Sequence, residues 1–274
     1  MKDSDHLFGN IFREFYNNGE LGSRILTAAK DLEDFIPKSN LSGKTFLDAG
    51  CGGGIISAAA TKFDPIKIVS FDYDPKMVEF SKKVKKQSAY LGDWSIISGN
   101  ILDSSFVESL PQFDYVYCWG VVHHTGDMWK GIANIITRVA DNGYIYLGIY
   151  NDASAFGFWD DRRFGTSLMW KKIKSALYKS PRLIKHAISK SAKAIYWIFS
   201  KTEFLFGKYK FKNFEQRGMD SDVSIDDWLF GHPYEYASVD EIINYMREEG
   251  FILEKIQSNI GLRTNHYLFK KVKI

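Results

Sequence analysis

A glycine-rich turn follows a run of β-forming residues near the start of the chain. The segment 46–54 reads FLDAGCGGG and leads directly into a helical pattern. Glycine has no Cβ, so the backbone can come close to a ligand, and the free amides at a helix start can bind a carboxylate or a phosphate. The turn therefore fits either a nucleotide or the carboxylate of an amino acid.

A carboxylate follows the next β-type run, because Asp72 stands 20 residues after Gly52. At that place a carboxylate can accept hydrogen bonds from two ribose hydroxyls. A dinucleotide turn counted from Gly50 would need glycine where Ile55 stands. Asp48 can face an ammonium group, which a pyrophosphate turn does not require. The pattern favours an adenosine ligand, and the alternative is a tight loop in which Asp72 caps a helix.

Two histidines, His123 and His124, follow the fourth β-type run. They are expected at the crevice where open α/β sheets bind ligands. An imidazole near its usual pKa can take the proton of a hydroxyl, which contributes a factor of about 10² to 10⁴ to a rate. The alternative is a histidine that packs in the loop and bonds the backbone. We take the pair as candidate catalytic bases and favour His124.

Alternating strand and helix patterns must position these groups. The sequence predicts strands at 44–48, 66–71, 94–99, 114–119, 143–149, 252–257 and 266–272. It predicts helices at 55–62, 75–90, 104–110 and 127–140, the last one closed by Asn142-Gly143, and a helix through Glu249 that starts in a capping box of Ser238 and Glu241.

The segment from about 152 to 227 has a different character. Its first helical pattern places Met169, Trp170, Ile173 and Leu177 on one face. A second helix, starting after Ser180-Pro181, is predicted to have an apolar side of Ile184, Ala187, Ile188, Ile195 and Ile198. Between 162 and 217 there are fifteen Lys/Arg and two acids, a net charge of +13, while the rest of the chain carries −10. This basic piece fits an anionic partner, and the alternative is a pair of helices with solvated lysines outside.

Composition bounds the function further. Cys51 and Cys118 have neither disulfide nor metal-ligand spacing, so we expect no metal site. The segment 1–6 is polar and acidic and no stretch is long and apolar enough to span a bilayer, which predicts a cytoplasmic protein, with peripheral membrane contact as the variant that the basic helices would permit.

Four blocks together resemble the class I S-adenosylmethionine-dependent methyltransferases: the turn at 46–54, Asp72, SGNILD at 98–103 and WGVVHHTGDMW at 119–129. The resemblance implies a Rossmann-like, doubly wound α/β sheet of seven strands, mostly parallel with an antiparallel C-terminal strand, and a helical lid insertion. It implies that the methionine end of S-adenosylmethionine lies by Asp48, Gly50, Cys51 and Gly52. The ribose would lie by Asp72 and Tyr73 and the adenine by Asn100 and Ile101, with Trp119 nearby. Many relatives carry Asp where Asn100 stands.

A closer resemblance is to a bacterial group of methyltransferases similar to the ubiquinone-biosynthesis enzyme UbiG. It is carried by IYND at 149–152, RGM at 217–219 and DWLFGHPYE at 227–235. It implies acceptor binding by Tyr150, Asn151, Arg217, Trp228, His232, Tyr234 and Glu235. The label does not establish a quinone substrate.

The resemblance implies three units: an N-terminal helical segment at 1–40, a cofactor-binding domain at 41–151 and 227–274, and a basic lid at 152–226. We expect O-methylation of a small, anionic acceptor, such as a sugar or phosphorylated precursor of a surface polysaccharide. Methylation of a membrane-associated prenyl quinone or lipid, or of RNA, stays an alternative, with nucleic acid the less favoured partner. A cofactor-binding partner subunit without its own activity is a further alternative.

Overall fold

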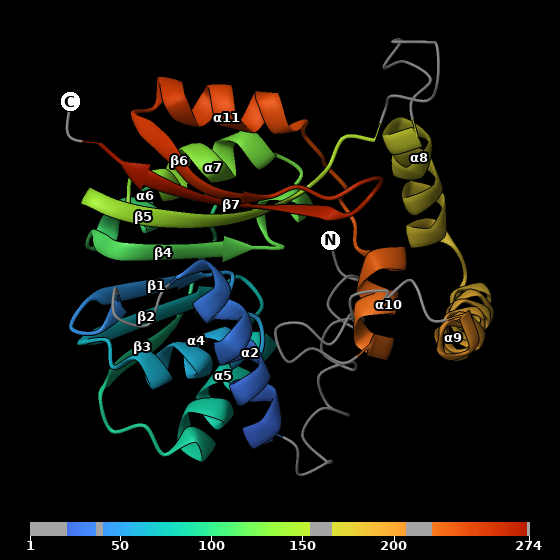
Figure 1. Ribbon diagram of the computed structural model, residues 1–274, viewed down its shortest axis with the longest axis horizontal. Coiled ribbons are helices and arrows are strands. Elements are labelled where there is room, and N and C mark those ends of the chain that lie inside the picture. The colour runs from blue at the N-terminus through green and yellow to red at the C-terminus, as the bar shows by residue number, and fades with distance from the viewer. Residues whose placement is uncertain (1–20, 37–40, 154–165, 207–220, 273–274) are drawn as a thin grey trace.

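The computed structural model describes residues 21–36, 41–153, 166–206 and 221–272 (Figure 1). Within these residues, seven strands form one sheet in the order β3-β2-β1-β4-β5-β7-β6. The strands are β1 (Thr45–Ala49), β2 (Lys67–Asp72), β3 (Asp93–Ser98), β4 (Phe113–Trp119), β5 (Val139–Tyr150), β6 (Phe251–Gln257) and β7 (Thr264–Lys271).

The first five strands pair in parallel, and β7 pairs antiparallel with both β5 and β6. The strand order reverses between β1 and β4. Ligands of open α/β sheets bind at such a switch point, beyond the carboxyl ends of the strands. The predicted doubly wound sheet with its antiparallel last strand is confirmed.

Helices cover both faces of this sheet (Figure 1). One face is packed by α2 (Leu21–Phe35), α4 (Ile55–Ala60) and α5 (Pro75–Ser88), and the other by α6 (Ser104–Ser109), α7 (Met128–Ile136) and α11 (Val239–Glu248). Short 3₁₀ turns, η3 (Thr61–Phe63) and η4 (Val122–His124), follow α4 and β4. The capping box that the sequence predicts at Ser238 and Glu241 is present at the start of α11.

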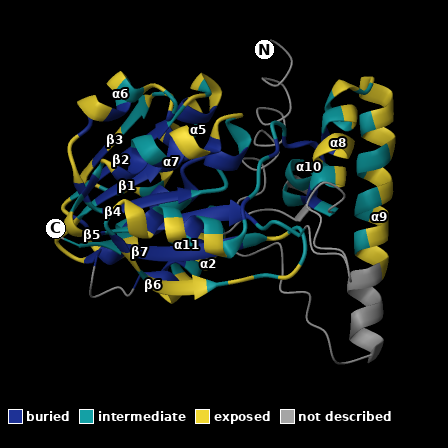
Figure 2. Cartoon of the chain, turned by 90° about the horizontal axis from the view of Figure 1, so that it is seen from above, coloured by how far each residue is buried: buried dark blue, intermediate teal, exposed yellow. Residues whose placement is uncertain are grey.

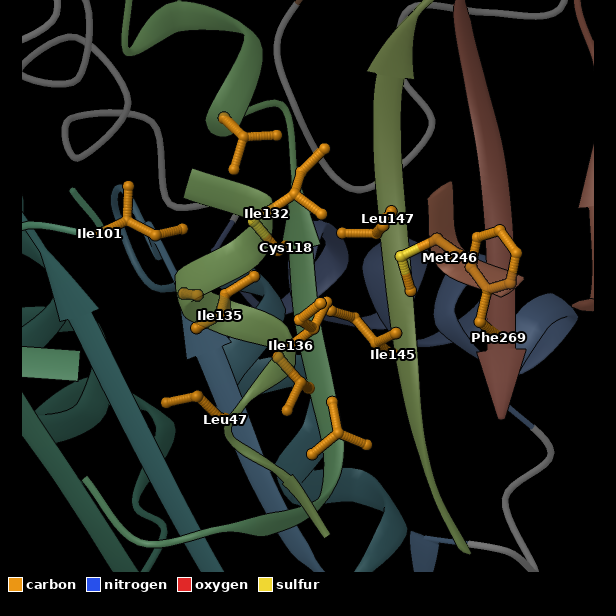
Figure 3. Packing of buried hydrophobic residues seen from close by; sticks show 14 of the residues in the cluster. Leu47, Ile101, Cys118, Ile132, Ile135, Ile136, Ile145, Leu147, Met246 and Phe269 are labelled. Atoms are coloured by element: carbon orange, nitrogen blue, oxygen red, sulfur yellow. The ribbon is translucent and has the colours of Figure 1, made fainter. Parts of the chain in front are cut away.

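Alternation along the strands assigns neighbouring side chains to different cores. Leu47 of β1 and Leu147 of β5 face the core shared with α7 and α11, and Phe46 and Tyr146 face the core shared with α2 and α4. Figure 3 shows the first of these cores, where Ile132 of α7 lies over the strands. Both faces of the central strands are therefore buried, and only their ends are available for binding.

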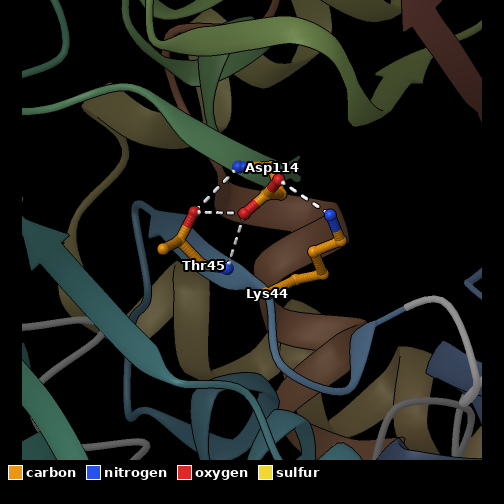
Figure 4. Close-up of polar contacts among 3 residues, drawn as sticks. All are labelled: Lys44, Thr45 and Asp114. Atoms are coloured by element: carbon orange, nitrogen blue, oxygen red, sulfur yellow. Dashed lines mark hydrogen bonds and ion pairs between the residues drawn. The ribbon is translucent and has the colours of Figure 1, made fainter.

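A half-buried carboxylate joins the starts of β1 and β4 (Figure 4). Asp114 accepts hydrogen bonds from the Thr45 amide and hydroxyl, both at 2.9 Å, and its own amide donates to the Thr45 hydroxyl at 2.9 Å. Lys44 adds an ion pair at 3.5 Å. Burial acts to raise the pKa of Asp114, but the bonds from Thr45 and the charge of Lys44 outweigh it and lower that pKa. The clamp fixes the register of the two strands that flank the switch point.

The predicted helix at 127–140 is too long. Helix α7 ends at Ile136, and β5 already starts at Val139, so Asn142 and Gly143 lie inside a strand instead of closing a helix. The register between β4 and β5 shifts there, and Asn142 takes a positive φ of 60°. A Cβ on Gly143 would lie 2.8 Å from the Ala140 carbonyl oxygen, so the irregular strand needs a glycine. Turn-forming residues such as Asn142 and Gly143 occur at irregularities in strands as well as at helix ends.

Three helices, which we call the lid helices, lie beside the carboxyl ends of the strands: α8 (Thr166–Lys179), α9 (Arg182–Phe206) and α10 (Ser221–Phe230). They share a small core, which we call the lid core, made of Ile225, Leu229 and Phe230 with Trp170, Leu177, Ile188, Ala192, Tyr196 and Trp228 packed against them. The expected domain boundary at 226/227 falls inside α10, and the three-unit division stays a prediction.

The predicted apolar faces of the lid helices are only partly right. In α8, Trp170 and Leu177 pack inward, but Met169 and Ile173 are exposed, because the buried side is rotated toward Ser167 and Lys174. In α9, Ile188 packs inward while Ile184, Ala187, Ile195 and Ile198 are exposed (Figure 2). Helix periodicity locates an apolar stripe but does not say which of two sides meets the body of the protein.

Candidate functional site

The glycine-rich turn is held by the neighbouring strand. The amides of Gly50 and Cys51 both donate to the Phe71 carbonyl oxygen, at 2.8 and 2.9 Å. Gly50, Gly52 and Gly54 have positive φ values of 73°, 51° and 78°. A Cβ on Gly50 would lie 2.4 Å from Val121, so glycine lets the turn pack directly against the loop after β4.

Asp72 lies at the end of β2 beside this turn. Its carboxylate accepts the Gly52 amide at 2.8 Å and the Asp74 amide at 2.9 Å, one on each oxygen. Burial raises its pKa, and these amide bonds oppose the rise. Each carboxylate oxygen can accept a second hydrogen bond, so the pair of oxygens retains capacity for two ligand hydroxyls.

Asp48 is buried beneath the turn. Its carboxylate accepts the Ser57 hydroxyl at 2.5 Å; that hydroxyl is 2.7 Å from the Ser70 hydroxyl, which accepts the Trp94 indole N–H at 2.8 Å. Burial raises the pKa of Asp48 to about 7. Sequence reasoning did not include Ser57, Ser70 or Trp94, because their role depends on contacts between separate elements.

The other residues expected at the cofactor surround this region. Cys51 is buried beside Ser81, with 3.4 Å between Sγ and Oγ, and Tyr73 is exposed. Asn100 is exposed after β3, and its side-chain oxygen accepts the Leu102 amide. The Ile101 side chain is buried. Trp119 lies at the end of β4, with its ring edge-on to His266 of β7 at 5.5 Å.

The two histidines of η4 have different environments. His123 is buried and accepts the Tyr150 amide on Nδ1 at 3.3 Å. The Nδ1 of His124 lies 2.7 Å from the Pro233 carbonyl oxygen, and no described residue bonds its Nε2. Burial lowers the pKa of His124; Asp227 opposes this, and Lys174 and His232 add to it. His124 therefore has a neutral ring whose Nε2 is buried and has no hydrogen-bond partner among the described residues.

A buried lysine that the sequence analysis did not select connects the lid to the body. Lys174 of α8 donates to the Gly231 carbonyl oxygen at 3.3 Å, and its ammonium lies 5.1 Å from the ring centre of Tyr150 and 4.6 Å from that of Tyr234. Burial lowers its pKa to about 8, against the opposing charge of Asp227. One signal could have found it: Lys174 shares a helical stripe with Trp170 and Leu177.

Some of the expected acceptor residues gather here. Tyr150 and Tyr234 lie with ring centres 5.0 Å apart, next to His123 and His124. Tyr234 is buried, and no described residue bonds its hydroxyl. The ring of His232 lies 4.7 Å from that of Tyr178 in α8.

Other residues that were expected to bind the acceptor make hydrogen bonds or ring contacts within the protein, or lie outside the described residues. Asn151 bonds Asn265 and the Gly261 carbonyl, and Glu235 accepts the Gly126 and Met128 amides at the start of α7. Trp228 stacks on Trp170 in the lid core at 4.6 Å. Arg217 lies outside the described residues.

A cavity of about 460 Å³ opens between α8 and the loop after α10. Its lining combines two lysines and a histidine with apolar surface: Gly126, Leu168, Lys171, Lys172, Ser175, His232, Pro233, Tyr234 and Glu235. Lys171 and Lys172 bring two positive charges to this lining against the single negative charge of Glu235, whose oxygens already accept two amides, so the cavity suits an acidic group.

Comparison with known proteins identifies the family of this chain. Residues 21–205 match a family model described as a methyltransferase domain. A mitochondrial ubiquinone biosynthesis O-methyltransferase from Schizosaccharomyces pombe is 31% identical over 117 residues, 42% of this chain and 41% of that protein. A tRNA U34 carboxymethyltransferase from Campylobacter concisus is 30% identical over 115 residues, 40% of this chain and 37% of that protein. The matches thus span less than half of these curated relatives.

Solved structures share the fold. The magnesium protoporphyrin IX methyltransferase of Synechocystis, solved with bound SAH, superposes with a TM-score of 0.53 at 14% identity, over 96% of this chain and 93% of that one. An O-methyltransferase family protein from Burkholderia thailandensis gives a TM-score of 0.53 at 13% identity, over 95% of this chain and 60% of that one.

The residues at the switch point fit an adenosyl sulfonium with an amino-acid end. Asp72 offers acceptors for ribose hydroxyls, the turn offers backbone without side chains, and the buried carboxyl of Asp48 lies beneath the turn. The finer likeness to the UbiG group rests on distant relatives of 25% and 31% identity. The chain belongs to the family of methyltransferase domains, and the cofactor of that family is S-adenosylmethionine.

Proposed function

We propose that this protein methylates a hydroxyl oxygen of a small acceptor that carries an acidic group. The carrying observation is His124, whose Nδ1 is engaged by the Pro233 carbonyl and whose Nε2 has no partner among the described residues. A carbonyl oxygen can only accept, so the Nδ1–H tautomer is fixed and Nε2 is left as a proton acceptor.

The cofactor, which Asp48, the glycine-rich turn and Asp72 would hold, would supply a methyl group bonded to a positively charged sulfur. The acceptor oxygen would bond to the methyl carbon as the carbon–sulfur bond breaks, and the sulfur would leave as the thioether of S-adenosylhomocysteine. The protein aligns the two reactants and keeps water away. The rings of Tyr150 and Tyr234 supply an apolar wall beside His124. The Nε2 of His124 takes the proton of the acceptor hydroxyl as the oxygen attacks.

The acidic group of the acceptor would lie in the cavity between α8 and the loop after α10, where Lys171 and Lys172 supply positive charge. A phosphorylated sugar, such as a precursor of a surface polysaccharide, combines the two required features, a free hydroxyl and an anion. Lys174 is too buried to reach solvent and acts on this region by holding α8 against Tyr150 and Tyr234.

The test is turnover by the purified chain with a panel of hydroxylated acceptors, half of them phosphorylated and half matched neutral sugars, read out as release of S-adenosylhomocysteine and as methylated product. We expect turnover with phosphorylated acceptors and at least about a tenfold lower kcat/KM for the neutral partners. Methylation of nitrogen only would contradict the proposal, and so would cofactor binding without turnover on any acceptor.

A double variant, Lys171→Ala with Lys172→Ala, tests the positive charge of the cavity separately from proton transfer to His124. Both side chains are exposed, so their removal leaves the fold intact. We expect KM for the phosphorylated acceptor to rise about tenfold while kcat stays within about twofold. An unchanged KM would show that the acceptor does not bind in the cavity, and it would not affect the proposed role of His124 as the base.

A further inference from the structure

A stripe of exposed apolar side chains runs along one side of α9. Leu183 is 85% exposed, Ile184 48%, Ile195 55% and Ile198 53%, and all four fall on one side of the helix at its period of 3.6 residues. Trp197, 58% exposed, flanks the stripe. Large aliphatic side chains gathered on one exposed face mark a surface that binds something apolar.

The opposite side of α9 already accounts for its packing. Ile188, Ala192 and Tyr196 lie in the lid core, and Lys193 pairs with Asp226 of α10 at 2.7 Å. Helix α9 is therefore held to the lid by its inner face. The outer stripe adds nothing to that contact, and its exposure needs another explanation.

The charges around the stripe are of one sign. Between 166 and 198, the chain contains eight Lys/Arg and no Asp or Glu: Lys171, Lys172, Lys174, Lys179, Arg182, Lys185, Lys190 and Lys193. Lys190 is exposed on α9 next to the apolar stripe, Arg182 is exposed at the first turn of α9, and Lys179 is exposed at the end of α8. Aliphatic surface flanked by cations complements the boundary between anionic head groups and acyl chains.

The position of α9 leaves this face accessible. Helix α9 runs along the edge of the molecule, beyond α8 and α10, with much of its described length exposed (Figure 2). No helix among the described residues is long and apolar enough to cross a membrane. Contact with a bilayer would consequently be made from the surface, with the helix lying in the interface.

We propose that the outer face of α9 docks this protein on an anionic lipid bilayer. Leu183, Ile184, Ile195 and Ile198 enter the head-group boundary, and Lys179, Arg182 and Lys190, which do not line the acceptor cavity, bind the lipid phosphates. A second copy of the chain fits the face less well, because pairing two such faces would bring two sets of like charges together. RNA would use the cations but would leave the aliphatic stripe in water.

Docking would bring the cavity between α8 and the loop after α10 close to the membrane surface. Helix α8, which precedes α9 directly, contacts the end of β5 through Lys174 and Tyr150. The docking proposal does not depend on the acceptor, since none of the α9 residues that it uses lines the cavity or is among the residues that affect the pKa of His124. It can therefore fail while the proposed methylation stands, and the reverse also holds.

The experiment is flotation of the full chain with vesicles of phosphatidylcholine alone or mixed with phosphatidylglycerol, at low and high ionic strength. The test variant is Leu183→Asp with Ile198→Asp. The matched control is Leu91→Asp with Ile260→Asp, because these two side chains are 99% and 95% exposed at other sites. Circular dichroism and thermal melting verify that all three proteins are folded.

We expect binding to the anionic vesicles to be at least about tenfold tighter than to neutral ones and to weaken with salt. The α9 variant should lose about tenfold or more of that affinity, and the control should keep it. The proposal is overturned by absence of vesicle binding or by equal losses in variant and control. It is also overturned if the α9 variant abolishes self-association or RNA binding while leaving vesicle binding unchanged.

Discussion

The Nδ1 atom of His124 lies 2.7 Å from the carbonyl oxygen of Pro233. This contact joins the 3₁₀ turn after β4 to the loop after α10, two segments more than a hundred residues apart in the chain. It also decides which ring nitrogen holds the proton. The reactive edge of the imidazole and the position of the lid loop are thus set by the same hydrogen bond.

Replacing His124 by alanine should lower kcat by a factor of about 10² to 10⁴, the usual contribution of a general base. Affinity for S-adenosylmethionine should stay within about twofold, because His124 is not among the groups at the glycine-rich turn. Because burial lowers its pKa, the acid limb of the pH–rate profile should lie below the usual histidine value of 6.5. Steady-state kinetics and calorimetry measure these quantities.

His123→Ala is the variant with which His124→Ala should be compared. His123 is buried and its Nδ1 accepts the Tyr150 amide, so its loss should cost about 1–3 kcal/mol of folding free energy through an unsatisfied donor. Full turnover by folded His124→Ala protein would exclude the base role of that residue.

Lys174→Met should raise the pKa of His124. The substitution keeps the length and apolar stem of the side chain but removes a cation whose charge lowers that pKa. The groups left around the ring are His123, His232, Asp227 and the Pro233 carbonyl, of which Asp227 favours the protonated ring. Histidine resonances in a pH titration by NMR report the shift, without any acceptor present.

Lys172→Met is the matched control, since Lys172 is exposed on the same helix. It should leave the His124 resonance unchanged. If both variants titrate like the wild type, Lys174 has no electrostatic effect on His124.

Cofactor affinity should rise with pH around neutrality. The pKa of Asp48 is raised to about 7 by burial, and an ammonium group prefers the ionised carboxylate, whose fraction grows as pH rises through 7. Calorimetry at pH 6 and pH 8 should show roughly a tenfold gain in affinity, with proton release near pH 7. Asp48→Asn should bind at least about tenfold more weakly and without this pH dependence.

The same substitution, which weakens cofactor binding, should raise the stability of the protein at alkaline pH. A carboxyl with a raised pKa in the folded state binds more protons than in the unfolded chain between about pH 4 and 7, so the free energy of unfolding falls as pH rises through that window. Asp48→Asn removes this fall, and the variant should melt higher than the wild type at pH 8. An equal melting difference at pH 5 and pH 8 would argue against the shifted pKa.

Asp114→Ala should destabilise the sheet by about 1 kcal/mol, a value kept low because the side chain is about a third exposed. Its pKa is lowered, so its contribution is present above the unfolded value near 3.9 and is lost as pH falls below it. Asp93→Ala, which removes an exposed ion pair to Lys67 at 3.6 Å, should cost less than about 0.5 kcal/mol. Urea unfolding compares the two, and equal effects would contradict the clamp.

The sheet could be predicted from the sequence because β-forming runs alternate with helical patterns and are separated from them by turn residues. The same turn residues misled the assignment at Asn142-Gly143, where a strand irregularity and a helix end share one sequence signature. In the lid, periodicity located α8 and α9 but not their orientation. Lys174 faces inward in α8 because two tyrosines and a carbonyl from distant segments receive its ammonium.

The candidate site could be predicted where single motifs carry it. Asp72 and the glycine turn are local features, and the structure places them side by side through the Gly52 amide. Pro233 and Ser57 could not be selected, because their roles depend on which segments the fold brings together. Asn151 and Glu235 were expected at the acceptor; the side chain of Asn151 bonds Asn265 and the Gly261 carbonyl, and Glu235 lines the cavity with its carboxylate held by two amides.

The carbonyl oxygen of Phe71 receives two amides of the glycine turn. The conformation of the glycine-rich turn is therefore fixed by the central sheet before any ligand binds, and the Gly50 and Cys51 amides should resist hydrogen exchange in the empty protein. Adaptation to new acceptors can then proceed in the lid alone, while the half of the enzyme that receives the methyl donor stays rigid and unaltered.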